Sequence, residues 1–239
     1  MKCIHFIGGA RPNFVKIAPL LKLFDKEKLF NSCFINTGQH YDKVLSENII
    51  KDLNLRKPDF NLGIGSGSHI YQISEIMRKY EKILFKKKPD LVIVFGDVNS
   101  TIAAALAAKK NGIKVAHVEA GLRCYDDNLP EEINRRLTDS LSDILFTPSK
   151  NENLNLKKEN ITKNVFFVGN IMIDSLISFF EKNNDKPNFS NIDGLITLHR
   201  PENVDEKKKF ESILKNIEKW TKKYRILFPI HPRTKKKSY

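Results

Sequence analysis

The stretch LVIVFGDVNSTIAAALAAKK, residues 91–110, decides the fold class of the chain. Its first part, Leu91–Phe95, is apolar throughout, which is typical of a parallel strand covered on both faces of its sheet. Ser100–Lys110 then predicts a helix, and polar residues connect the two. A buried strand that leads through a polar turn into a helix is the unit from which parallel α/β sheets are built.

The same unit repeats on both sides of this stretch. Further strands are predicted at Cys3–Ile7, Cys33–Asn36, Val115–Val118, Ile144–Phe146 and Val165–Val168. The predicted helices between them are Pro12–Phe24, Tyr41–Leu53, Tyr71–Phe85, Glu131–Leu141, Lys150–Lys158 and Ile171–Glu181. Strands that alternate with helices of this length favour right-handed βαβ units, so we expect an α/β fold with a Rossmann-like parallel sheet.

A polar stretch separates this region from a second, shorter one. Lys182–Asn191 contains Pro187 and four asparagines, which indicates a linker. We therefore expect an N-terminal Rossmann-like catalytic domain over residues 1–182 and a partial C-terminal domain over residues 183–239. In the second region the predicted elements are strand Leu195–Leu198, helix Val204–Lys223 and strand Ile226–Ile230. Two strands and one helix are few for an independent domain, so this piece either packs onto the first domain or belongs to a chain that is cut short.

The amino-acid composition limits the kinds of molecule that the chain is expected to bind. The chain has 239 residues and a net charge of +13, with lysine runs at 86–88, 207–209 and 235–237. This charge favours an anionic partner, whether nucleic acid, a membrane surface or a phosphorylated metabolite, although scattered lysines also suit a solvated exterior. No nucleic-acid-binding motif accompanies the charge, so we do not expect nucleic acid to be the partner.

The cysteine pattern and the apolar runs indicate a cytoplasmic protein. The three cysteines follow no metal-ligand spacing, which predicts reduced thiols and no metal site. Cys3–Ile7 is too short for a signal peptide, and no run approaches the length of a membrane span.

Cationic and acidic residues follow the predicted strands at the edge where open α/β sheets bind ligands. Arg11 and Lys16 follow the first strand at a helix N-terminus, an arrangement that suits phosphate binding or is a plain turn with incidental charges. Asp97 and Glu119 each close a buried strand, where a carboxylate can be desolvated into a better base. Helix capping explains Asp97 equally well. His117 precedes Glu119 in the chain, and we expect its side chain to point away from the site and to have a structural role.

Other candidates follow further strands. His40 follows the second strand and suits either a substrate contact or a helix-capping or packing role. Glu131 and Arg135 share one face of the helix that Pro130 begins, either as site residues or as a surface ion pair. Cations follow both strands of the second region, at His199, Arg200 and His231, and suit contacts with a pyrophosphate.

Together these motifs resemble the non-hydrolysing UDP-N-acetylglucosamine 2-epimerases. The matching motifs run in order from residue 4 to the tail: GARPNFVKIAP (residues 9–19), TGQHYD, GDVNST, HVEAGLR, PEEINR, VGN (residues 168–170), TLHRPENVD and HPRTK. HVEAGLR followed by PEEINR is the most specific part. The resemblance implies the two-domain glycosyltransferase-B architecture, in which residues 183–239 begin a second Rossmann-like domain that binds UDP.

The resemblance also implies roles for individual residues. The acid/base carboxylates would be Asp97, Glu119 and Glu131. The residues implied to bind substrate are Arg11 and Lys16 at the nucleotide sugar, Gln39, His40 and Arg135 at the sugar cleft, His199 and Arg200 at the diphosphate, and His231 near the nucleotide. The implied reaction eliminates UDP to give a 2-acetamidoglucal and adds it back, without a metal or redox cofactor. A homodimer acting in surface polysaccharide synthesis is expected by analogy.

Two alternatives stay open at this point. The motifs do not separate UDP-N-acetylglucosamine from a UDP-2,3-diacetamido uronic acid as substrate. Family members also continue past the position of Tyr239 with a Ser-Gly-Gly loop and a glutamate that bind UDP. We therefore expect a C-terminally truncated chain with weak or absent UDP binding, and the second alternative is an inactive remnant.

Overall fold

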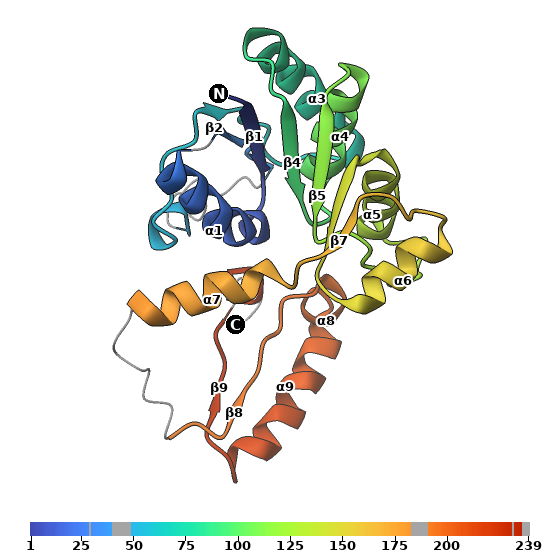
Figure 1. The fold of residues 1–239 in the computed structure, drawn as a ribbon. Helices are drawn as coiled ribbons and strands as arrows, with labels where there is room; N and C mark the ends of the chain where they lie inside the picture. The colour runs from blue at the N-terminus through green and yellow to red at the C-terminus, as the bar shows by residue number, and fades with distance from the viewer. Residues whose placement is uncertain (29, 40–48, 183–190, 231, 236–239) are drawn as a thin grey trace. The chain divides into compact units, whose positions relative to one another are not determined.

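The computed structural model describes residues 1–28, 30–39, 49–182, 191–230 and 232–235 (Figure 1). The chain divides into two compact units, Met1–Lys182 and Asn183–Tyr239. Each unit is built on parallel strands joined by helices, so the predicted α/β fold class is confirmed.

The first unit contains a parallel sheet with the strand order β3-β2-β1-β4-β5-β6-β7. The strands are β1 Cys3–Gly8, β2 Asn31–Asn36, β3 Phe60–Asn61, β4 Leu91–Phe95, β5 Lys114–Val118, β6 Ile144–Thr147 and β7 Val165–Phe167. The central strands are aligned with one another: Phe6 of β1 lies opposite both Phe34 of β2 and Ile93 of β4. Strand β3 was not predicted, because two residues are too short to show an apolar pattern.

Helices cover both faces of this sheet. They are α1 Arg11–Glu27, α3 His69–Lys86, α4 Asn99–Lys110, α5 Pro130–Leu141, α6 Lys150–Lys158 and α7 Ile171–Lys182. Strand β4 alternates between two apolar clusters, with Val92 and Val94 in the cluster that α3 and α4 complete. Ile93 and Phe95 belong to the other cluster, which α1 completes. Burial on both faces is the reason why this strand is apolar at every position.

The turn between β1 and α1 is built by Asn13. Its Oδ1 accepts hydrogen bonds from the backbone N–H groups of Gly9 at 3.2 Å and Ala10 at 3.1 Å, and its Nδ2 donates to the carbonyl of Phe95 at 2.9 Å. A Cβ atom at Gly9 would collide with the hydroxyls of Thr37 and Ser100. The first turn of α1 is therefore fixed against the carboxyl ends of β2 and β4.

Two predictions differ from the structure, and one helix lies largely outside it. The predicted helix Tyr41–Leu53 falls mostly on residues 40–48, which lie outside the described residues. In the second unit the predicted helix Val204–Lys223 is two helices, α8 Pro201–Val204 and α9 Lys207–Thr221, because Glu206 takes a non-helical conformation as the N-cap of α9. The predicted strands there are shorter, β8 Gly194–Leu195 and β9 Ile226–Leu227.

The second unit pairs β8 with β9 in parallel, and α9 lies between them in the chain. Val204 and Phe210 are its buried apolar side chains among the described residues. A short helix, α10 Pro232–Lys235, follows, and the hydroxyl of Thr234 donates to the carbonyl of Leu198 at 2.5 Å. Within the described part of the chain, no helix combines the length and the apolar character that crossing a bilayer requires.

Candidate active site

A buried ion pair joins α1 to the end of β5. The Nζ atom of Lys16 contacts Oε2 of Glu119, and the two side chains are 7% and 15% exposed. Gly96, which follows β4, lies directly beneath this pair. A Cβ atom there would be 2.9 Å from Lys16 Nζ and 3.2 Å from Glu119 Oε2. Three segments that are far apart in the sequence therefore meet at the carboxyl edge of the sheet.

The backbone of Glu119 is strained. Its φ of 77° lies in the left-handed region, which residues other than glycine rarely adopt. The N–H groups of Glu119 and Ala120 both donate to the carbonyl of Phe146, at 3.1 and 3.0 Å, and hold the chain in this conformation. Strain of this kind concentrates at functional sites because the surrounding structure must impose it.

A second carboxylate is paired with a second cation. Arg135 of α5 donates to Oδ2 of Asp97 from Nη2 at 2.6 Å and from Nε at 3.0 Å. Helix α4 has no side-chain cap at its N-cap residue, Val98. The carboxylate of Asp97 thus serves the ion pair, and the helix-capping interpretation of this residue is wrong.

The guanidinium group of Arg135 also contacts Glu132, which is fully buried. Nη1 of Arg135 donates to Oε2 of Glu132 at 3.1 Å, and so does the backbone N–H of Cys124 at 3.0 Å. Burial raises the pKa of Glu132, but the hydrogen bonds from Cys124 and Arg135 outweigh burial and keep this pKa below its ordinary value. Burial likewise lowers the pKa of Arg135, and the ion pair with Asp97 reverses that shift. Both groups therefore stay charged.

Polar residues close the edge of the site at the start of α4. Oε1 of Gln39 accepts from the backbone N–H of Ser100 at 3.0 Å and from its hydroxyl at 2.7 Å. Asn134 donates from Nδ2 to the backbone carbonyl of Asp97 at 2.8 Å. The loop that carries Asp97 is thus tied to α5 through its backbone as well as through its side chain.

The remaining predicted residues are less enclosed. Arg11 begins α1 and is exposed, and Glu131 is exposed on α5. Arg135 pairs with Glu132 and Asp97, so the surface ion pair between Glu131 and Arg135 is not formed. His199 and Arg200 follow β8 in the second unit and are exposed. His40 and His231 lie outside the described residues.

Sequence reasoning missed Glu132. Two consecutive glutamates begin α5, and the position of a residue in a helix does not show which side chain faces the protein until the rotation of the helix is known. The only available signal was the spacing of three between Glu132 and Arg135, which permits the observed contact.

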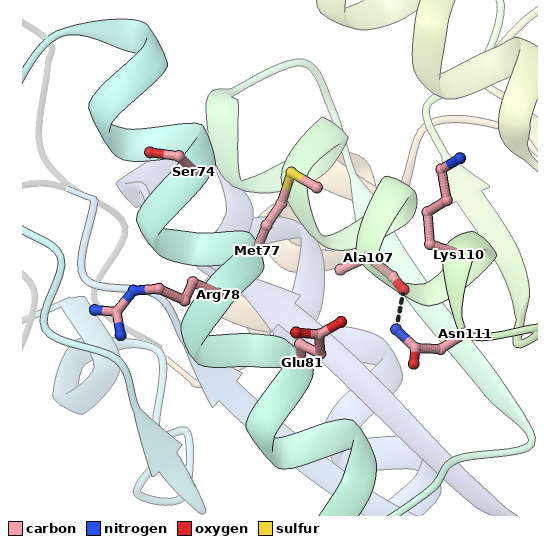
Figure 2. A pocket seen from close by; sticks show the side chains of 7 residues that line it. All are labelled: Ser74, Met77, Arg78, Glu81, Ala107, Lys110 and Asn111. Atoms are coloured by element: carbon pink, nitrogen blue, oxygen red, sulfur yellow. Dashed lines mark hydrogen bonds between the residues drawn. The ribbon is translucent and has the colours of Figure 1, made fainter.

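A separate hollow of 360 Å³ lies between α3 and α4 (Figure 2). Its lining is Ser74, Met77, Arg78, Glu81, Ala107, Lys110 and Asn111. Lys110 and Asn111 lie at the carboxyl end of α4, whereas Ser100 of the candidate site lies at the amino end. Among the described residues predicted to bind substrate, none lines this hollow.

Comparison with known proteins identifies the family. The family model described as UDP-N-acetylglucosamine 2-epimerase matches residues 22–239. The chain belongs to the UDP-N-acetylglucosamine 2-epimerase family. A UDP-N-acetylglucosamine 2-epimerase homolog of Methanococcus maripaludis is 47% identical over 99% of this chain and 67% of the relative. The UDP-2,3-diacetamido-2,3-dideoxy-D-glucuronate 2-epimerase of Pseudomonas aeruginosa is 38% identical over 98% of this chain and 68% of its own length.

Solved structures of the UDP-N-acetylglucosamine 2-epimerase family share the fold. The enzyme of Methanocaldococcus jannaschii in complex with UDP-GlcNAc and UDP is 40% identical, with a TM-score of 0.87 over 98% of this chain and 67% of that one. The enzyme of Neisseria meningitidis bound to UDP-GlcNAc is 33% identical, with a TM-score of 0.85 over 99% of this chain and 68% of that one. The chain therefore spans about two thirds of the length of these relatives.

Proposed function

We propose that this chain catalyses epimerisation at C2 of a UDP-sugar and interconverts UDP-N-acetylglucosamine and UDP-N-acetylmannosamine. The observation that carries the proposal is the pairing of two carboxylates with two cations at one sheet edge, Glu119 with Lys16 and Asp97 with Arg135. Family membership supplies the substrate class, because the related enzymes from M. jannaschii and N. meningitidis were crystallised with UDP-GlcNAc.

The reaction that suits this arrangement is elimination followed by addition. The C2 proton of the sugar is not acidic, so its removal by a carboxylate must accompany the departure of UDP from C1. The C2–H and C1–O bonds break, and C1=C2 forms in an enzyme-bound 2-acetamidoglucal. A proton then returns to the opposite face of C2 while UDP re-attacks C1. No net oxidation or reduction occurs.

The residues of the site fit the requirements of these steps. General acid–base catalysis needs carboxylates within reach of C2, and we assign that role to Asp97 and Glu119, with Glu131 as a third carboxylate. The departing diphosphate needs cations, and Lys16, Arg11 and Arg135 are the candidates on the first unit. Lys16 is a suitable cation because it is already held beside Glu119 and loses little freedom when it binds an anion.

Deuterium exchange tests the proposal. The chain, and a version extended by the last third of the M. maripaludis relative, are incubated in deuterated water with each UDP-sugar, and NMR follows deuterium at C2. We expect exchange with UDP-N-acetylglucosamine, at least in the extended version. If neither protein exchanges C2 of any sugar, the assignment as an epimerase fails.

A second substrate has its own support in the P. aeruginosa relative, whose name specifies a UDP-2,3-diacetamido uronic acid. The same NMR experiment with that sugar decides between the two, because the faster exchange identifies the substrate. Calorimetry with UDP on the unextended chain tests the remnant alternative, since micromolar binding argues against a remnant. The homodimer and the cytoplasmic location stay predictions.

A further inference from the structure

A buried histidine contacts the loop that carries Asp97 directly and is connected to the loop that carries Glu119 through one buried carboxylate. His117 of β5 is fully buried and is adjacent in the chain to neither Asp97 nor Glu119. Its Nε2 lies 2.8 Å from the carbonyl oxygen of Gly96, the residue before Asp97. Its Nδ1 lies 2.7 Å from Oδ1 of Asp139 on α5.

Asp139 extends this network to the second loop. Its Oδ2 accepts from the backbone N–H of Gly121 at 3.1 Å, two residues after Glu119. The same oxygen pairs with Nη1 of Arg123 at 2.8 Å, and both side chains are 0% exposed. One buried carboxylate therefore connects the loop after β5 with the histidine that supports the loop after β4.

The partners of His117 determine where its protons lie. A carbonyl oxygen only accepts hydrogen bonds, so Nε2 must carry a proton and donate it to Gly96. Nδ1 faces Asp139, whose other oxygen already receives two donors, as an ionised carboxylate does. The simplest arrangement that satisfies every contact has a proton on both ring nitrogens of His117.

The charges of the network support the same arrangement. Arg123 also pairs with Glu159 at 2.6 Å, so one arginine faces two carboxylates, those of Asp139 and Glu159. With a charged His117 the network holds two positive and two negative groups. Buried charges are tolerated when they are paired and hydrogen-bonded, and this balance meets that condition.

We propose that His117, doubly protonated and held by Asp139, is a positioning residue that fixes the Gly96–Asp97 turn and, through Asp139, the Glu119 loop. It touches neither substrate nor the reacting atoms. This role rests on the proposed epimerase function, because that function makes Asp97 and Glu119 the catalytic carboxylates of the two loops. The proton count on the imidazole ring can be measured without any activity.

NMR of the chain with ¹⁵N-labelled histidine tests the proton count. The chain has six histidines, and the signals of His117 are those lost in the His117→Phe variant. We expect two ring N–H signals for His117 in the wild-type chain. Asp139→Asn must place its amide oxygen toward Gly121 and Arg123 and its NH₂ toward Nδ1, so only the Nε2–H signal is expected in that variant. A wild-type ring with one N–H overturns the proposal.

Kinetics of the extended chain tests the positioning role. His117→Phe leaves the Gly96 carbonyl without its donor, and we expect kcat to fall about 100-fold with KM nearly unchanged, the effect of displacing a catalytic group by about 1 Å. Asp139→Asn keeps a weaker, neutral Nε2–H donor and is expected to lose about tenfold, since charge-assisted hydrogen bonds are roughly twice as strong as neutral ones.

The matched control is Asp143→Asn. Asp143 accepts from the N–H of Val115 at the opposite end of β5 at 2.8 Å and pairs with Lys109. It should lower stability without lowering kcat, which separates positioning from general destabilisation. Loss of activity that follows stability across all three variants, or a kcat for His117→Phe within about threefold of wild type, overturns the positioning role. Absence of C2 exchange in the wild type refutes the proposed function instead, and the ring N–H count still decides the inference.

Discussion

Adding one methyl group at Gly96 tests the geometry of the site most sharply. Gly96 has a φ of +64°, and a Cβ atom there would lie 2.9 Å from Lys16 Nζ. The left-handed backbone costs about 1 kcal/mol in an alanine. The ammonium group of Lys16 must also move, and because it is buried against Glu119 its displacement disturbs the ion pair.

Gly112→Ala is the matched control for this substitution. Gly112 has a φ of +68°, and a Cβ atom there would meet nothing within 4 Å. The control therefore carries the same backbone cost of about 1 kcal/mol without any crowding. The difference in unfolding free energy between the two variants isolates the contact with the ion pair.

Urea unfolding followed by circular dichroism measures stability, and C2 deuterium exchange in the extended chain measures activity. We expect Gly112→Ala to retain full activity and Gly96→Ala to lose about 100-fold or more in kcat, as expected when a catalytic group shifts by about 1 Å. Gly96→Ala should also be the less stable variant. Equal stability and equal activity in the two variants would show that the Lys16–Glu119 pair is not where the reaction occurs.

Three further predictions follow from individual contacts. Asp97→Asn and Glu119→Gln should each lower turnover by several orders of magnitude, about 10²–10⁴-fold for the loss of general acid–base catalysis, while circular dichroism shows an intact fold; retained activity in both would remove them from the mechanism. Glu132→Gln should reduce the loss of stability in acid. The pKa of Glu132 is depressed in the folded chain, so its carboxylate stabilises the fold above the pKa of the unfolded chain, and this stability is lost as pH falls through the folded pKa. If the urea midpoint of the variant falls in acid as much as that of the wild type, the prediction is wrong. His5 is buried beside the hydroxyl of Tyr80, and burial lowers its pKa from 6.5 to about 4. Between pH 6.5 and 4, His5 is therefore protonated in the unfolded chain but neutral in the folded chain. The free energy of unfolding should fall by about 3 kcal/mol as pH drops from 6.5 to 4, and His5→Phe should abolish this pH dependence.

Much of the first unit could be predicted from the sequence, because its strands are buried on both faces. Leu91–Phe95 was predicted with its observed bounds, since each of its residues enters one of the two apolar clusters. The second unit was harder. Its paired strands are two residues long, and the break between α8 and α9 depends on the backbone conformation of Glu206, which no periodic pattern records.

The candidate site, too, could be predicted only in part from the sequence. Asp97 and Glu119 could be found because a polar residue at the end of an apolar strand stands out in the sequence. Lys16 and Arg135 were also candidates, but their pairing with these carboxylates could not be predicted, since Lys16 lies 103 residues from Glu119 and Arg135 lies 38 residues from Asp97. The network of His117 and Asp139 could not be predicted either, because the position of a residue on a strand does not show which distant side chain it contacts.

In the proposed reaction, paired charges at the carboxyl edge of the sheet let UDP leave C1 and return. Positional isotope exchange tests this directly in the extended chain, with ¹⁸O placed in the oxygen that bridges C1 and the β-phosphate. Departure of UDP frees the β-phosphate to rotate, so we predict that the label spreads to the non-bridging β-phosphate oxygens at least as fast as deuterium enters C2. Inversion at C2 with all the ¹⁸O still in the bridge would contradict the account.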